Sequence, residues 1–173
     1  RSVDEVEKEL RELVERITRF VEKSVRDSRK IVEDSKREVE KVKDDLRKIV
    51  EEIRRKVPEK DVERVKRVVE EVERRVETLA EENRKIVERT ERRSKELVDT
   101  VREVVREVVE KVRKDNSEED AKRLVKEVAE LIKRVVEEMK KLNDEVEESA
   151  RRSVEEARRL VEEVKRLVDE VAT

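Results

Sequence analysis

The sequence predicts an all-α protein, a single-chain antiparallel bundle of three long helices that run up, down and up. Three observations carry this prediction. Apolar residues recur with helical spacing along nearly the whole chain, only two short segments interrupt that spacing, and glycine is absent. A length of 173 residues suits one domain with a substantial core, here spanning residues 1–173.

The first helix begins at a strong capping signal and ends before the only proline. Ser2 followed by Glu5 fits a capping box. Pro58 disfavours helix at the residue before it but suits the first turn of a new helix. We therefore expect one helix to end near Lys56 and the next to begin at about Pro58.

The second break contains Asn116 and Ser117. Asparagine can take the left-handed backbone conformation that ends many helices, and serine is a good N-cap. The predicted helices therefore lie near 2–56, 58–114 and 117–172. Because both connections are so short, successive helices must run antiparallel.

The apolar stripe repeats every eighteen residues. In the first helix one column reads Val3, Val21 and Val39, and the third helix has Leu124, Leu142 and Leu160. Eighteen residues make five turns at about 3.6 residues per turn, so the stripe follows one side of a straight helix. A heptad repeat would instead wind a left-handed supercoil.

Surface charges reinforce this regularity, with Glu-to-Arg pairs four residues apart: Glu7/Arg11, Glu12/Arg16, Glu147/Arg151 and Glu155/Arg159. Over its whole length the chain resembles computationally designed straight helical bundles. The resemblance implies a synthetic scaffold with no natural biochemical function, found in the cytoplasm of an expression host, because no targeting signal indicates another location. A natural repeat or coiled-coil protein is the alternative origin.

Polar residues replace apolar ones in the middle block of every helix. Val6 and Val42, for example, flank Ser24 in one column, and Val65 and Val101 flank Asn83 in another. The predicted site consists of nine such residues: Ser24, Ser28, Ser35, Asn83, Thr90, Ser94, Asn143, Ser149 and Ser153.

Antiparallel packing predicts that these residues meet in two layers. The first layer contains Ser28, Thr90 and Asn143, with Ser24 and Ser94 beside it. The second contains Ser35, Asn83 and Ser149, with Ser153 beside it, and an apolar layer separates the two. Each layer has one asparagine, whose amide offers two donors and two acceptor lone pairs, enough to connect two other helices.

Two interpretations of the band remain open. In the first, buried hydrogen-bond networks fix the register of the helices. In the second, the band is a polar cavity for a small molecule, because Ser28, Ser35, Ser149 and Ala150 remove volume that Met139 only partly restores. Ordered water fits either interpretation.

Composition argues against other classes of function. The net charge of −2, from 48 basic and 50 acidic residues, favours neither nucleic acid nor an anionic membrane. Histidine and cysteine are absent, and the core columns contain no carboxylate, so we expect no enzyme activity, metal or cofactor. We expect a soluble monomer that needs no partner, and the sequence leaves open a domain-swapped dimer and the handedness of the bundle.

Overall fold

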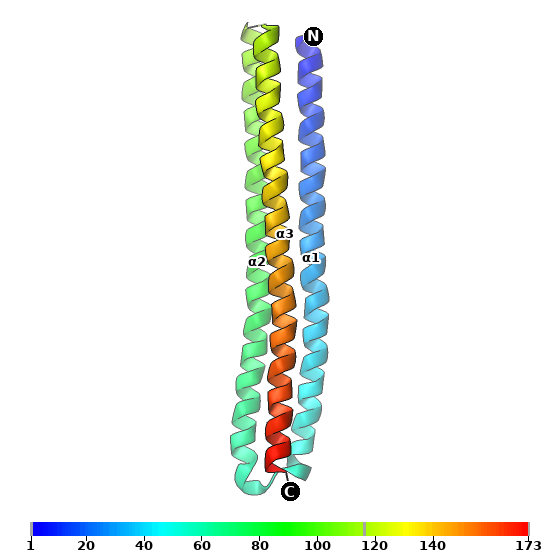
Figure 1. The fold of residues 1–173 in the computed structure, drawn as a ribbon, viewed down its shortest axis with the longest axis vertical. Helices are drawn as coiled ribbons and strands as arrows, with labels where there is room; N and C mark the ends of the chain where they lie inside the picture. The colour runs from blue at the N-terminus through cyan, green and yellow to red at the C-terminus, as the bar shows by residue number, and fades with distance from the viewer. Residues whose placement is uncertain (1, 116, 173) are drawn as a thin grey trace. The chain divides into compact units, whose positions relative to one another are not determined.

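The computed structural model describes residues 2–115 and 117–172, which form three helices and no strand. Helix α1 spans Val3–Lys56, α2 spans Glu59–Asp115 and α3 spans Glu118–Val171 (Figure 1). All three helices pack pairwise against one another. The predicted all-α three-helix bundle is therefore confirmed.

The N-termini of α1 and α3 are capped by the two predicted serines. The backbone N–H of Glu5 donates to Ser2 Oγ at 3.2 Å, and the backbone N–H of Asp120 donates to Ser117 Oγ at 3.4 Å. Each serine satisfies an amide hydrogen that has no partner inside its helix. The capping residues stand just outside the helices, so α1 and α3 begin one residue later than predicted. Asn116, predicted to take a left-handed conformation, lies outside the described residues.

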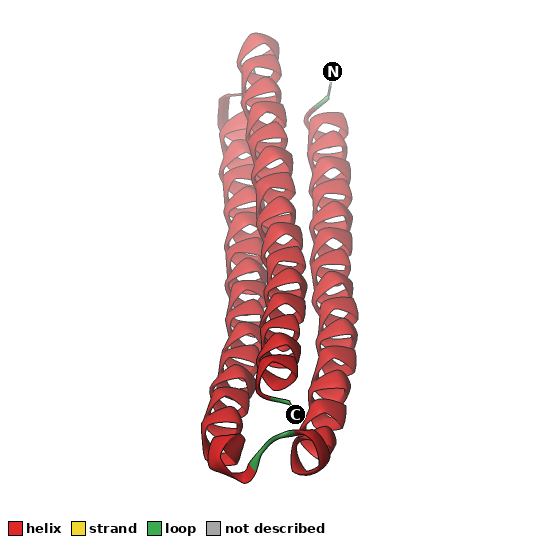
Figure 2. Ribbon diagram, turned by 60° about the horizontal axis from the view of Figure 1, so that its bottom comes forward, coloured by secondary structure: helices red, strands yellow, loops and turns green. Residues whose placement is uncertain are grey.

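The connection between α1 and α2 is a two-residue loop, Val57–Pro58 (Figure 2). Val57 N–H donates to the Ile53 carbonyl at 2.9 Å, and Asp61 N–H donates to the Pro58 carbonyl at 2.9 Å. Pro58 was predicted to open α2, but the helix begins at Glu59. Proline here supplies the first acceptor carbonyl of the turn, a role that needs no amide hydrogen.

The chain divides into two compact units. Unit 1 comprises the chain up to Ser28 and the segment Glu88–Glu145, and unit 2 comprises Arg29–Val87 and the chain from Val146 onward. Each helix contributes a segment to both units. In unit 1, the start of α1 lies beside the end of α2, where Arg113 of α2 pairs with Glu7 of α1.

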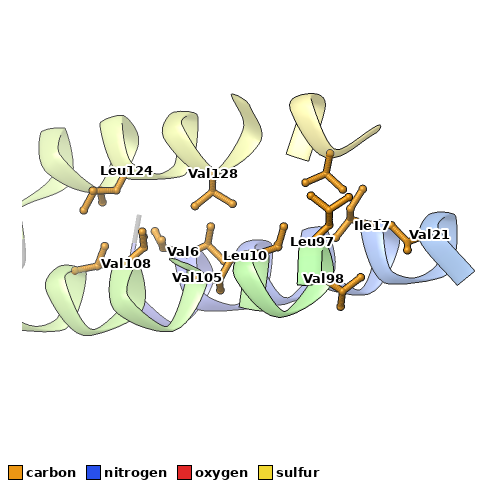
Figure 3. Close-up of a cluster of buried hydrophobic side chains, with 14 of the residues drawn as sticks. Val6, Leu10, Ile17, Val21, Leu97, Val98, Val105, Val108, Leu124 and Val128 are labelled. Atoms are coloured by element: carbon orange, nitrogen blue, oxygen red, sulfur yellow. The ribbon is translucent and has the colours of Figure 1, made fainter. Parts of the chain in front are cut away.

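Each unit has its own apolar core. Valines and leucines of unit 1 face one another from all three helices, with Leu10 and Val128 completely buried (Figure 3). The core of unit 2 contains Val65 and Val164, which are equally inaccessible. Valine is a mediocre helix former, so these positions derive their stability from burial of apolar surface. None of the helices, over their described residues, has a stretch long and apolar enough to cross a membrane.

Candidate functional site

Seven of the nine predicted polar residues are buried, and two are only half-buried. The buried residues are Ser24, Ser28, Ser35, Asn83, Thr90, Ser94 and Ser153. Asn143 and Ser149 on α3 keep part of their surface exposed, so the prediction that they are buried is wrong. The column of Ser149 runs along the flank of the apolar stripe, since Leu131 and Leu167 in the same column are also half-buried.

In unit 1, a side-chain hydrogen bond joins α1 to α3. Ser28 Oγ donates to Asn143 Oδ1 at 2.6 Å, and Ser28 is completely buried. The Ser94 hydroxyl is satisfied differently, because it contacts the Thr90 carbonyl one turn back at 2.6 Å and Met139 Sδ at 3.4 Å. Met139 therefore fills space beside a buried hydroxyl while offering it a weak acceptor.

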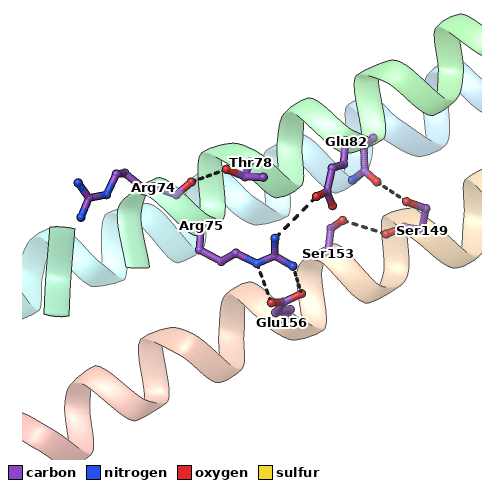
Figure 4. Close-up of polar contacts among 8 residues, drawn as sticks. Arg74, Arg75, Thr78, Glu82, Ser149, Ser153 and Glu156 are labelled. Atoms are coloured by element: carbon purple, nitrogen blue, oxygen red, sulfur yellow. Dashed lines mark hydrogen bonds and ion pairs between the residues drawn. The ribbon is translucent and has the colours of Figure 1, made fainter. Parts of the chain in front are cut away.

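In unit 2, the amide belongs to α2 and the hydroxyl to α3. Ser149 Oγ donates to Asn83 Oδ1 at 2.7 Å, and Ser153 Oγ donates to the Ser149 carbonyl at 2.9 Å (Figure 4). From α1, Ser35 Oγ donates to the Ala150 carbonyl at 3.2 Å. Helix α3 is thus hydrogen-bonded to both of its neighbours in this unit.

The predicted pairs Ser28–Asn143 and Asn83–Ser149 each share a layer and form a direct bond, but neither amide connects three helices. Each asparagine oxygen accepts from one hydroxyl, and Ser35 bonds a backbone carbonyl instead of Asn83. A helix carbonyl has a second lone pair, so it can accept a nearby hydroxyl without losing its helical bond. Among the described residues, no fully buried side-chain nitrogen or oxygen lacks a hydrogen-bond partner.

Ion pairs also join the helices, and the sequence did not predict them. Arg75 of α2 makes a two-pronged contact with Glu156 of α3, at 2.9 and 3.2 Å (Figure 4). Arg93 makes the same contact with Glu138, at 2.6 and 3.2 Å. Both partners of the second pair stand one eighteen-residue repeat from those of the first. This eighteen-residue spacing is the feature of the sequence from which the two ion pairs could have been predicted.

Helix α1 is tied to its neighbours by two further pairs. Glu7 contacts both Arg11 on its own helix and Arg113 on α2, and Glu38 contacts Arg158 on α3 at 2.9 Å. The hydrogen bond from Arg113 lowers the pKa of the Glu7 carboxyl. The hydrogen bond from Arg75 likewise lowers the pKa of Glu156 and raises that of the arginine. These carboxylates are therefore more stable in the charged form when the protein is folded.

The predicted pairs along each helix form in part. Glu7 and Arg11 meet at 2.6 Å as expected. Arg151 instead contacts Glu148 and Glu155, and Arg159 contacts Glu163 at 3.0 Å. Long exposed side chains have several carboxylates within reach, so spacing alone does not select the partner.

A groove of about 310 Å³ opens between α1 and α2 in unit 2. Its lining includes Ser35 and Asn83, together with the apolar side chains of Val32, Val39 and Ala80. The alternative interpretation of the band expects a polar cavity in the centre of the core, whereas this space reaches the polar residues from the side of the helix pair. An external molecule can approach Ser35 and Asn83 of the polar band through this groove.

Within the described residues, no group of three or more acidic, histidine or cysteine side chains is arranged to hold a metal ion. No protein-family model matches the chain, and no curated protein or solved structure shows significant similarity to it.

Proposed function

We propose that this chain is a computationally designed structural scaffold with no natural biochemical activity, in which the polar residues fix the register of the helices. One observation carries the proposal. In each unit, an asparagine and a serine on different helices form a direct side-chain hydrogen bond, Ser28 to Asn143 in one and Ser149 to Asn83 in the other.

Such a bond can specify register because it forms at one alignment only. Columns of valine and leucine discriminate poorly between small displacements of one helix along another, because apolar contacts have no directional preference. A slide of α3 past α1 would separate Asn143 from Ser28 and leave a buried hydroxyl facing apolar groups, which costs about 1–3 kcal/mol. Buried polar residues have this role in coiled coils, where a single asparagine selects the register.

The chemistry of the hydroxyls supports a structural role over catalysis. The buried serines with described contacts donate to an amide oxygen, a backbone carbonyl or a thioether. A nucleophilic serine would need a neighbouring base to accept its proton, and the sequence contains no histidine.

We also propose that the scaffold is a monomer that needs no partner. Among the described residues, Val50 is the one large apolar side chain that counts as exposed, at 37%. A single exposed valine is ordinary on a protein surface and does not form an interaction patch. Sedimentation equilibrium at micromolar concentration should give the mass of one chain, and a stable dimer would contradict this proposal.

The register proposal can be tested by replacing one polar layer with the residues of the flanking repeats. The variant Ser28→Leu/Thr90→Val/Asn143→Val removes donors and acceptors together and adds apolar burial, so its free energy of unfolding should rise. Its helices should lose their unique alignment, which would appear as doubled or broadened amide resonances from α1 and α3 in two-dimensional NMR.

The control is Ser94→Ala, which removes a buried hydroxyl of the same unit that bonds its own helix. This variant should keep one sharp set of resonances. If the triple variant also keeps one set, with the same contacts between α1 and α3 as the parent, register does not depend on the polar layer and the proposal fails.

A further inference from the structure

The groove between α1 and α2 in unit 2 combines apolar walls with a buried amide. Val39 is 3% exposed and Asn83 is 4% exposed, and both line the groove with Val32 and Ala80. A volume of about 310 Å³ lies at the lower end of the range for small-molecule pockets. A molecule of roughly the size of a six-membered ring would fit it.

The protein satisfies the oxygen of the Asn83 amide but not its nitrogen. Its Oδ1 accepts the Ser149 hydroxyl at 2.7 Å, but its Nδ2 donates no hydrogen bond to another described residue. Since no fully buried side-chain nitrogen among the described residues lacks a partner, this nitrogen keeps some accessible surface. Asn83 lines the groove, so its N–H groups are available to an acceptor held there.

The charges around the groove favour an uncharged occupant. Lys43 contacts Glu40 at 3.4 Å, and the Arg84 Nε contacts Glu81 at 3.0 Å. Glu33, Lys36 and Glu77 also line the groove, so its rim carries four acidic and three basic side chains and has no cluster of one charge sign. The hydroxyl of Ser35 already donates to the Ala150 carbonyl, so among the uncharged side chains that line the groove the Asn83 amide is the donor without a protein acceptor.

We propose that this groove is a binding site for a small uncharged molecule with an apolar ring and a carbonyl or ether oxygen. The ring packs against Val32, Val39 and Ala80, and the oxygen accepts a hydrogen bond from Asn83 Nδ2. In the absence of such a molecule, water satisfies the amide. This activity goes beyond the scaffold role and does not depend on it.

Cyclohexanone is the probe that tests the site, because it has one ring and one carbonyl acceptor. In a titration of the ¹⁵N-labelled protein, the side-chain NH₂ signals of Asn83 should shift and saturate, together with the backbone amides of Val32, Val39 and Ala80. The NH₂ signals of Asn143 are the internal control. They belong to a half-buried amide outside the groove and should not follow the same saturation curve.

Two variants separate the contributions of the amide and the walls. Asn83→Val, which matches the valines one repeat away in the same column, should weaken binding about fivefold, as expected for loss of one neutral hydrogen bond. Ala80→Leu fills the groove from a half-buried position and should abolish saturable binding. Asn143→Val is the matched control and should leave the dissociation constant unchanged.

Circular dichroism would establish that each variant remains helical. The proposal is overturned if the shifts never saturate, if the Asn83 and Asn143 amides respond alike, or if Asn83→Val binds cyclohexanone as tightly as the parent.

Discussion

The two units contain the same kind of hydrogen bond in different surroundings. In unit 1 the amide belongs to Asn143, which is half-buried on α3, and in unit 2 it belongs to Asn83, which is 4% exposed on α2. The bonds have nearly equal lengths, 2.6 and 2.7 Å. Burial distinguishes them, because an amide that water can reach has an alternative partner when its bond is lost.

The units also differ in how α3 fills its middle block. In unit 1, Met139 occupies a column that otherwise contains Ala121 and Ala157, and it is completely buried. In unit 2, Ala150 occupies a column that otherwise contains Ile132 and Val168. Compared with the flanking residues of the same columns, unit 1 therefore gains side-chain volume next to its polar residues and unit 2 loses it. The groove lined by Asn83 lies in the unit that loses volume.

The largest effect should come from Met139→Ala. The substitution leaves a cavity beside Ser94, whose hydroxyl contacts the methionine sulfur, and should lower the free energy of unfolding by about 2–5 kcal/mol. Urea unfolding followed by circular dichroism would measure it. The matched change is Ala157→Met, in the same column of unit 2, where the alanine is fully buried. Overpacking should cost about 1–3 kcal/mol there. A negligible cost for Met139→Ala would mean that unit 1 collapses around the gap.

The second prediction sets the two amides against each other. Asn143→Ala should cost about 2–3 kcal/mol and Asn83→Ala about 1 kcal/mol, because only the first leaves a completely buried hydroxyl, that of Ser28, without its acceptor. Equilibrium unfolding in guanidinium chloride would compare them. Equal costs would show that the partial exposure of Ser149 gives its hydroxyl no substitute from water.

The third prediction concerns hydroxyls that bond their own helix. Ser94 and Ser153 each donate to the carbonyl one turn back, a bond that forms without any neighbouring helix. Ser94→Ala and Ser153→Ala should each cost less than the Asn143 substitution, about 0.5–1 kcal/mol, and should differ little between the units. A much larger cost for Ser94→Ala would mean that its contact with Met139 contributes most of the lost free energy of unfolding.

The fourth prediction concerns the ion pair between α2 and α3, which occurs once in each unit. A double-mutant cycle on Arg93 and Glu138 should give a coupling of about 0.2–1 kcal/mol, typical of exposed pairs, that weakens at high salt. The corresponding cycle on Arg75 and Glu156 should behave alike, because the repeat reproduces the geometry. A clear difference between the cycles would show that the repeat does not give the two pairs equal surroundings.

The smallest effect is the pH dependence near neutrality. The pKa of Glu156 is lowered by its hydrogen bond to Arg75, and that of Glu7 by Arg113. A lowered folded-state pKa contributes stability above the unfolded value, about 4.3 for glutamate, and loses it as the pH falls through the folded-state pKa. The melting temperature should therefore be constant from about pH 5 to 9 and fall only in more acidic solution. A cooperative transition near pH 7 would contradict this expectation.

Local patterns in the sequence were sufficient to predict the three helices and to place each of their ends within one residue. Ser2 and Ser117 cap as expected because a serine hydroxyl reaches an amide only three residues away. The columns of the repeat also identified which residues turn inward, since position around a helix follows from residue number. Both inferences need only the geometry of a single helix.

Only the tertiary structure decided which polar groups meet. Ser35 bonds the Ala150 carbonyl, Asn143 keeps part of its surface, and Arg75 reaches across to Glu156. Each outcome depends on how far neighbouring helices are rotated and displaced. A hydrogen bond is lost over a change of about 0.5 Å beyond its normal range of 2.7–3.2 Å, whereas the apolar pattern locates a residue only to a face of its helix. The sequence by itself determines which side chains turn inward, and packing between helices determines which partner each one finds.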